Sequence, residues 1–200
     1  MKPVFHVDLE KILAGTGTKI LELGCGRKPH PGRIGIDRLD LSEVDIVADL
    51  EEGLPFLPDN SVDRIYSQSL LEHILNLDRL MNEIWRVLKP VGQLHVFVPH
   101  FSNPFFYSDY THVRFFGLYS FEYFSKSQRR FRRKVPDFYH TFSFRTLELV
   151  LNIGTGSRNP IKWAAQLIFN SSPVLQEFYE ANLCYLIPCY GLSAILEAER

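Results

Sequence analysis

The stretch Lys19-Ile-Leu-Glu-Leu-Gly-Cys-Gly26 decides the fold of this 200-residue chain. Its apolar residues predict a buried strand, and two glycines around one small residue predict a tight turn after it. Glycines are suited to such a turn because they adopt positive φ and let a ligand approach the backbone. The next apolar run, Arg33-Ile-Gly-Ile36, ends at Asp37. A carboxylate is therefore expected at the carboxyl edge of a parallel sheet, where nucleotide-like ligands bind.

Three interpretations of the glycine turn are open at this point. The dinucleotide fingerprint Gly-x-Gly-x-x-Gly would need a glycine where Pro29 stands, so its match is poor. The pattern acidic-x-Gly-x-Gly is met in full by Glu22-Leu-Gly-Cys-Gly26. The motif alone is also compatible with an ordinary turn after a core strand.

With Glu22, Gly24, Cys25 and Gly26 in this pattern, the chain resembles the class I S-adenosylmethionine-dependent methyltransferases. The similarity is to a compact type 11-like subgroup, in which Gly-Cys-Gly leads directly into a proline-rich turn. It implies that the glycine loop passes under the methionine part of the cofactor, and that Asp37, with Arg38 beside it, binds the ribose.

Residues 27–33 depart from the usual family pattern. Two prolines and a glycine among these seven residues exclude the full helix that most members have there. The helix N-terminus, a favourable place for an anion, is then missing or reduced to a turn. Arg27 and Lys28 either supply the lost positive field or are simply solvated.

The later segments extend the resemblance to about residue 98. Strands are expected at 45–49, 61–66 and 93–98, and an amphipathic helix at 77–88. The resemblance implies that Asp49 and Leu50 read the adenine, and that Ser67 and Gln68 lie near the methyl-bearing end. The string Arg86-Val-Leu-Lys-Pro90 resembles the family signature that continues with two glycines, but here Val91 replaces the first.

The expected fold class is α/β: a doubly wound, seven-stranded, mostly parallel sheet of the Rossmann-like methyltransferase type. Segments 140–152 and 191–197 supply the last two strands, with a helical insertion at 160–187 between them. One domain covers residues 1–200, with 1–18 as an N-terminal brace or lid. Segments 99–139 and 160–187 are expected on the acceptor side. The insertion suits a lid, a pocket for an apolar acceptor, or the surface of a homodimer.

The catalytic candidates are His100, Asp109 and His112, which follow the fifth strand. An oxygen or nitrogen acceptor must lose a proton before or after it attacks the methyl group. Histidine can take that proton near neutral pH, and Asp109 could orient His112. Alternatively, Asp109 caps a helix, both histidines are polar loop residues, and catalysis relies on proximity. His73 has an equal claim to a structural or cofactor-side role.

The composition and charge of the chain limit which partners and surroundings it is expected to have. A net charge of −1 argues against a dedicated nucleic-acid binder. The basic run 126–134 is either solvated or holds an anionic acceptor. Three cysteines cannot all pair, which indicates a reduced, cytoplasmic protein, and no Cys/His set has the usual zinc spacing. No apolar run is long enough to predict a membrane span.

The expected function is methyl transfer from S-adenosylmethionine to a small or medium acceptor, by O- or N-methylation. A sugar, a lipid or a nucleotide-linked precursor is a candidate acceptor. Two other classes remain: a catalytically inactive methyltransferase-fold module for binding or regulation, and a nicotinamide-dependent oxidoreductase. The missing third glycine disfavours the oxidoreductase.

Overall fold

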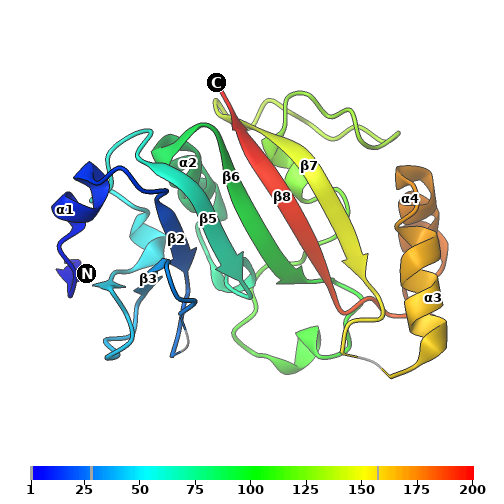
Figure 1. The fold of residues 1–200 in the computed structure, drawn as a ribbon. Coiled ribbons are helices and arrows are strands. Elements are labelled where there is room, and N and C mark those ends of the chain that lie inside the picture. Colours follow the sequence, from blue (N-terminus) through cyan, green and yellow to red (C-terminus); the bar gives the residue numbers. More distant parts are fainter. Residues whose placement is uncertain (1, 28, 157) are drawn as a thin grey trace.

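A single mixed sheet forms the centre of the computed structural model, which describes residues 2–27, 29–156 and 158–200. Lys28, considered above with Arg27, lies outside the described residues. The strands run in the order β1-β4-β3-β2-β5-β6-β8-β7 (Figure 1). Their bounds are β1 Val4–Phe5, β2 Ile20–Leu23, β3 Ile34–Asp37, β4 Ile46–Val47, β5 Val62–Gln68, β6 Leu88–Pro99, β7 Ser143–Asn152 and β8 Gly191–Glu199.

Five consecutive strands of the sheet are parallel to one another. The pairs formed beyond them, at both ends of the sheet, are antiparallel. Strands β4, β3, β2, β5 and β6 pair in parallel, β8 is antiparallel to β6, and β7 is antiparallel to β8. All seven predicted strands are confirmed. The two-residue β1, which pairs antiparallel with β4, is an additional edge strand within the N-terminal segment.

Helix α2, Leu77–Val87, supplies the core of one side of the sheet. Its N-cap is Asn76, whose side chain accepts a hydrogen bond from the Arg79 amide at 3.3 Å. Residues at helical spacing then point to the sheet, because positions three and four apart share a face. They are Leu77, Leu80, Met81, Ile84 and Val87, all buried. The predicted amphipathic helix is thus confirmed.

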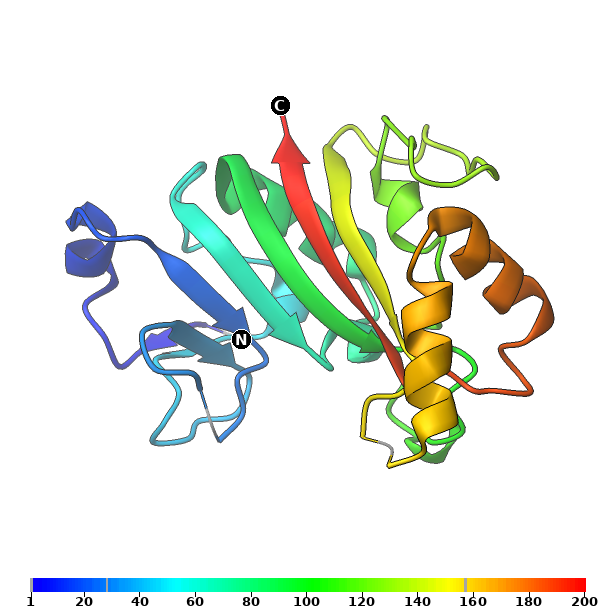
Figure 2. The same ribbon diagram turned by 45° about the vertical axis from the view of Figure 1, so that its right-hand side comes forward.

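The other helices lie at the ends of the sheet. Helix α1, Leu9–Ala14, follows β1 and is capped by Asp8. Helices α3, Pro160–Phe169, and α4, Pro173–Asn182, stand beside the β7 edge (Figure 2). They are the predicted insertion between the last two strands. No helix among the described residues is long and apolar enough to cross a membrane.

Single turns of 3-10 helix occur in four connections: Leu50–Glu52, Leu71–His73, Phe106–Ser108 and Phe121–Phe124. The sequence 119–124 alone predicts the start of a helix with Ser120 as its cap. The described chain forms only the Phe121–Phe124 turn there, and the Ser120 hydroxyl instead accepts a hydrogen bond from the Gly117 amide at 2.9 Å.

One face of the sheet carries no helix among the described residues. In Figure 1, α2 lies behind the sheet, and β5, β6 and β8 face the viewer. The connection between β2 and β3 is the proline-rich turn, which is held by Glu22: its carboxylate accepts a hydrogen bond from the His30 amide at 2.9 Å. Side chains on this face cover one another instead. The Arg33 guanidinium lies 3.6 Å from the centre of the Tyr66 ring, and His95 stacks on that ring.

Part of the basic run 126–134 turns inward. Arg130 donates to the Leu149 carbonyl at 3.0 Å and to the Gln176 side chain at 3.1 Å, and burial lowers the pKa of its guanidinium. Lys134 donates to the Phe131 carbonyl at 2.7 Å. Only Arg130 is half-buried, whereas Lys134, like Arg132 and Arg133, is exposed.

Candidate cofactor and acceptor site

A cavity of about 380 Å³ lies where β2, β3, β4 and β5 end. Its volume falls within the range of small-molecule sites. Residues from several separate segments line it: Gly24, Asp37, Arg38, Asp49, Leu50, Glu51, Ser69, Leu70, His73, Ile74 and Thr111. The position agrees with the expected binding edge of the sheet.

The glycine turn forms one wall of this cavity. Gly24 has φ of +68°, and a Cβ there would lie 3.0 Å from Leu70 Cδ1. Gly26 also has positive φ, and its amide donates to Asp37 Oδ2 at 2.9 Å. The other Asp37 oxygen accepts from the Leu39 amide at 3.0 Å. The carboxylate is therefore fixed beside the turn, and each oxygen keeps a lone pair for a ligand hydroxyl.

Asp49 and Leu50 lie at the end of β4 on the same cavity. Asp49 caps the following 3-10 turn by accepting from the Glu51 amide at 3.1 Å. This cap orients Oδ1 towards the backbone, and the other carboxylate oxygen remains available to a ligand in the cavity. Arg38 lines the cavity next to Asp37.

Five of the expected cofactor residues are not among those that line this cavity. One is Gly26, which contributes only its hydrogen bond to Asp37. Glu22, Ser67 and Gln68 line a second cavity of about 270 Å³, which includes residues of the open sheet face. Cys25 packs against Val44 and Val47, and burial raises the pKa of its thiol to about 11. Ser69 and Leu70 occupy the expected place of Ser67 and Gln68, because the chain leaves β5 at Ser69, where φ is +51°.

A polar cluster adjoins the cavity and brings Asp109 and His112 together. His112 Nε2 lies 3.6 Å from Asp109 Oδ2, and the His112 Nδ1 hydrogen bonds to the Phe106 carbonyl at 2.9 Å. Thr111 donates its hydroxyl hydrogen to Asp109 Oδ1 at 2.6 Å, and its oxygen lies 2.9 Å from His73 Nδ1. Since His73 and Thr111 also line the cavity, the cluster is continuous with its wall.

Glu72 belongs to this cluster and is absent from the sequence candidates. Its side chain is buried at 1% exposure, and its Oε2 has no hydrogen-bond partner among the described residues. Burial, with a smaller contribution from the negative charge of Asp109, raises the pKa of the carboxyl to about 7. The available signal was a single acidic residue inside the apolar run 70–74.

His100 is separate from the cavity lining and is fully buried. Its Nδ1 accepts from the Ser102 amide at 3.0 Å, and its Nε2 lies 3.1 Å from Glu180 Oε2 on α4. The same Glu180 oxygen accepts from the Leu118 amide at 2.7 Å. His100 therefore links the segment after β6 to α4.

Comparisons with known proteins agree with this fold. Residues 21–96 match a family model described as a methyltransferase domain. A ubiquinone/menaquinone biosynthesis C-methyltransferase from Hydrogenovibrio crunogenus is 40% identical over 85 residues, which are 42% of this chain and 30% of that protein. The chain thus matches less than a third of the length of this curated relative.

Two solved structures share the fold over most of both chains. A SAM-dependent methyltransferase from Archaeoglobus fulgidus has a TM-score of 0.54 and 15% identity, covering 94% of this chain and 90% of that one. The YcgJ protein from Bacillus subtilis has a TM-score of 0.52 and 16% identity, covering 96% and 97%. Residues 21–96 therefore match a methyltransferase domain, and the chain has the fold of a solved SAM-dependent methyltransferase.

Proposed function

We propose that the protein transfers a methyl group from S-adenosylmethionine to an oxygen or nitrogen atom of a small or medium acceptor. The observation that supports this most directly is the continuity of the site. The cavity beside Gly24 and Asp37 reaches His73 and Thr111, which are part of the polar cluster with Asp109 and His112. A cofactor pocket and a group of proton-accepting side chains thus adjoin each other.

The residues present fit the cofactor. Gly24 leaves the cavity wall free of a side chain, and the fixed Asp37 carboxylate can accept hydrogen bonds from ribose hydroxyls. Asp49 and Leu50 are available for the adenine at the end of β4. When bound, S-adenosylmethionine supplies a methyl group on a positively charged sulfur. The chain contributes position and orientation, which account for much of the rate in such transfers.

The acceptor is proposed to bind against segment 99–139, which contributes Asp109, Thr111 and His112. These side chains can orient an acceptor hydroxyl or amine and accept its proton. The curated relative is named as a C-methyltransferase, but its match covers only 85 residues. The acceptor atom is therefore assigned here from the polar cluster, and a sugar, lipid or nucleotide-linked precursor with a free hydroxyl or amine would suit it.

Calorimetric titration of the purified chain tests the cofactor assignment. We expect micromolar binding of S-adenosylmethionine and S-adenosylhomocysteine and no binding of NAD. Asp37→Asn should weaken binding by about tenfold or more, equal to roughly 1.4 kcal/mol or more, because it removes a charged hydrogen-bond acceptor. Asp40→Asn is the matched control, since Asp40 is exposed, pairs with His6 and is absent from the cavity lining.

Binding of NAD in place of S-adenosylmethionine would contradict the proposal. So would equal losses in the two aspartate variants, because the effect would then not be specific to the cavity.

A further inference from the structure

We propose that Glu72, His73 and His112 bind a divalent transition-metal ion of the zinc type at the acceptor end of the cavity. The role given to the ion rests on the proposed methyl transfer, whereas its binding does not. The sequence showed no zinc pattern because two of the ligands are adjacent and the third lies 39 residues later.

The three side chains already converge on one point. One carboxylate oxygen of Glu72 and one ring nitrogen of each histidine all lie within 4.8 Å of one another. Ligand atoms lie about 2.0–2.2 Å from a zinc ion, so small side-chain movements would complete the site. Two histidines and one carboxylate form a ligand set of catalytic zinc and of non-haem iron, which both keep positions open for substrate or water.

The carboxylate of Glu72 supplies the second, independent observation. It is buried at 1% exposure, and its Oε2 has no hydrogen-bond partner among the described residues. A buried charged or polar group without a partner is costly, and buried charges in proteins are usually paired or bound to a metal. A cation between Glu72 and the two histidines would satisfy this oxygen.

The hydrogen bonds around both histidines orient them as metal ligands. His112 Nδ1 donates to the Phe106 carbonyl at 2.9 Å, and His73 Nδ1 donates to Thr111 Oγ1 at 2.9 Å. Thr111 in turn donates to Asp109, so a carboxylate stands behind His73. Metal-binding histidines commonly donate their second ring N–H in this way, which leaves the lone pair of Nε2 for the ion.

An ion held there would act on the acceptor. His73 and Thr111 line the cofactor cavity, so the ion would lie beside the place where the methyl group is transferred. A divalent ion with an open position polarises an oxygen bound to it and makes its proton easier to lose. The inference therefore favours acceptors with a hydroxyl that can coordinate the ion, and gives His112 the role of ligand instead of base.

Metal binding is tested directly on the full chain without a histidine tag, after treatment with a chelator. Zn²⁺ is titrated by calorimetry, and Co²⁺ is added as an optical probe of coordination. We expect one ion per chain with a micromolar or tighter Kd. Glu72→Gln and His112→Gln should each weaken binding by about 100-fold or more, and Thr111→Val by about 10- to 100-fold, as for other residues that orient a ligand.

His6→Gln is the matched control, because it removes an exposed histidine that pairs with Asp40 outside the cluster. Its Kd for Zn²⁺ should equal that of the unchanged protein. Thermal unfolding of every variant, with and without Zn²⁺, checks that the proteins fold. The ion should raise Tm equally in the unchanged protein and the His6 variant, less in Thr111→Val, and least in the Glu72 and His112 variants.

Absence of saturable Zn²⁺ and Co²⁺ binding would overturn the metal site, as would equal affinity in the Glu72, His112 and His6 variants. The metal-free protein is also titrated with S-adenosylmethionine. Cofactor binding without metal binding would refute this inference alone. Metal binding without cofactor binding would refute the proposed methyl transfer and leave the metal site standing.

Discussion

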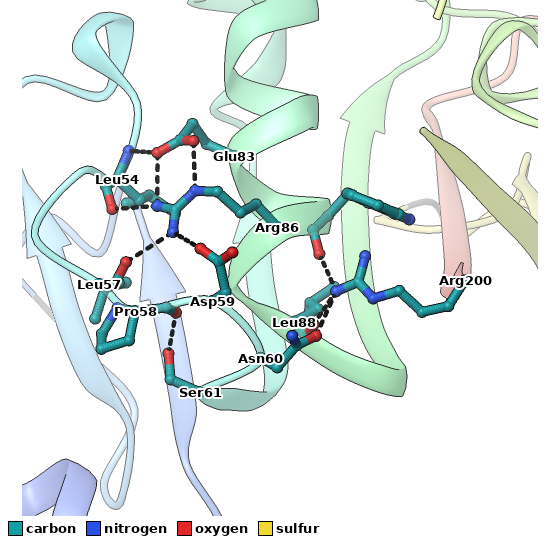
Figure 3. A network of polar contacts seen from close by, with 11 residues as sticks. Leu54, Leu57, Pro58, Asp59, Asn60, Ser61, Glu83, Arg86, Leu88 and Arg200 are labelled. Carbon is teal, nitrogen blue, oxygen red and sulfur yellow. Dashed lines mark hydrogen bonds and ion pairs between the residues drawn. The ribbon is translucent and has the colours of Figure 1, made fainter. Parts of the chain in front are cut away.

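Arg86 binds both carboxylate oxygens of Glu83, one turn earlier on α2 (Figure 3). Its Nε donates to Oε1 at 2.7 Å and its Nη2 to Oε2 at 2.9 Å. The remaining contacts reach the connection before β5: Arg86 donates to the Leu54 and Leu57 carbonyls and to Asp59. Glu83 accepts from the Leu54 amide at 3.0 Å. The pair thus fixes segment 54–59 against α2.

Removing one partner of this pair should destabilise the fold. Arg86→Met leaves the Glu83 carboxylate and two backbone carbonyls without their donor, so we expect the free energy of unfolding to fall by about 2–3 kcal/mol. Urea unfolding measures it. Arg79→Met is the control, since Arg79 makes a long, exposed pair with Glu52 and should cost about 0.5 kcal/mol or less. Equal losses in both variants would contradict the role of the pair.

The Glu83–Arg86 pair should also make the stability of the fold depend on pH. The hydrogen bond from Arg86, more than any other contact, lowers the pKa of Glu83. A carboxyl with a lowered folded-state pKa stabilises the fold above its unfolded value, about 4.3 for glutamate, and loses this contribution as pH falls through the folded value. Unfolding free energy should therefore decline below about pH 4.3, and less steeply in Glu83→Gln. Identical slopes in the two proteins between pH 5 and pH 3, about the range concerned, would refute this.

The parallel strands could be predicted from the sequence because a buried strand needs apolar residues, which form a short apolar run before a turn. The two-residue β1 escapes prediction because both of its residues are exposed, whereas the equally short β4 is buried within an apolar run. The glycine turn and Asp37 were identified because backbone conformation and a strand end restrict which residues occur there. The places of Glu72 and His100 could not be predicted this way. Their hydrogen-bond partners Val113 and Glu180 lie 41 and 80 residues later, and only the folded chain brings them together.

Val91 should be a site of backbone strain. It has φ of +59° where the related signature has glycine, and a β-branched residue adopts this conformation at a cost of about 1–2 kcal/mol. Val91 is exposed, so little packing is lost on replacement. Glycine relieves the strain but loses more backbone entropy on folding, which offsets part of the gain. Val91→Gly should therefore raise the free energy of unfolding, measured by urea unfolding, by about 1 kcal/mol.

Gly92→Ala provides the opposite case at the next residue of β6. A Cβ at Gly92 would lie 2.8 Å from the Lys89 carbonyl oxygen, so this variant should lose stability. If Val91→Gly were neutral or destabilising, the strain assigned to residue 91 would be wrong.

His100 is expected to stabilise the fold without contacting the cofactor. His100→Gln disturbs a buried set of hydrogen bonds to Ser102 and Glu180, and leaving such groups unsatisfied costs about 1–3 kcal/mol. The affinity for S-adenosylmethionine should stay unchanged, because His100 is absent from the cavity lining. Urea unfolding and calorimetry on one preparation separate the two effects. His6→Gln, which removes an exposed histidine that pairs with Asp40, is the control and should change stability by about 0.5 kcal/mol or less. A His100 variant with full stability and full cofactor binding but no methyl transfer would instead identify His100 as a catalytic residue.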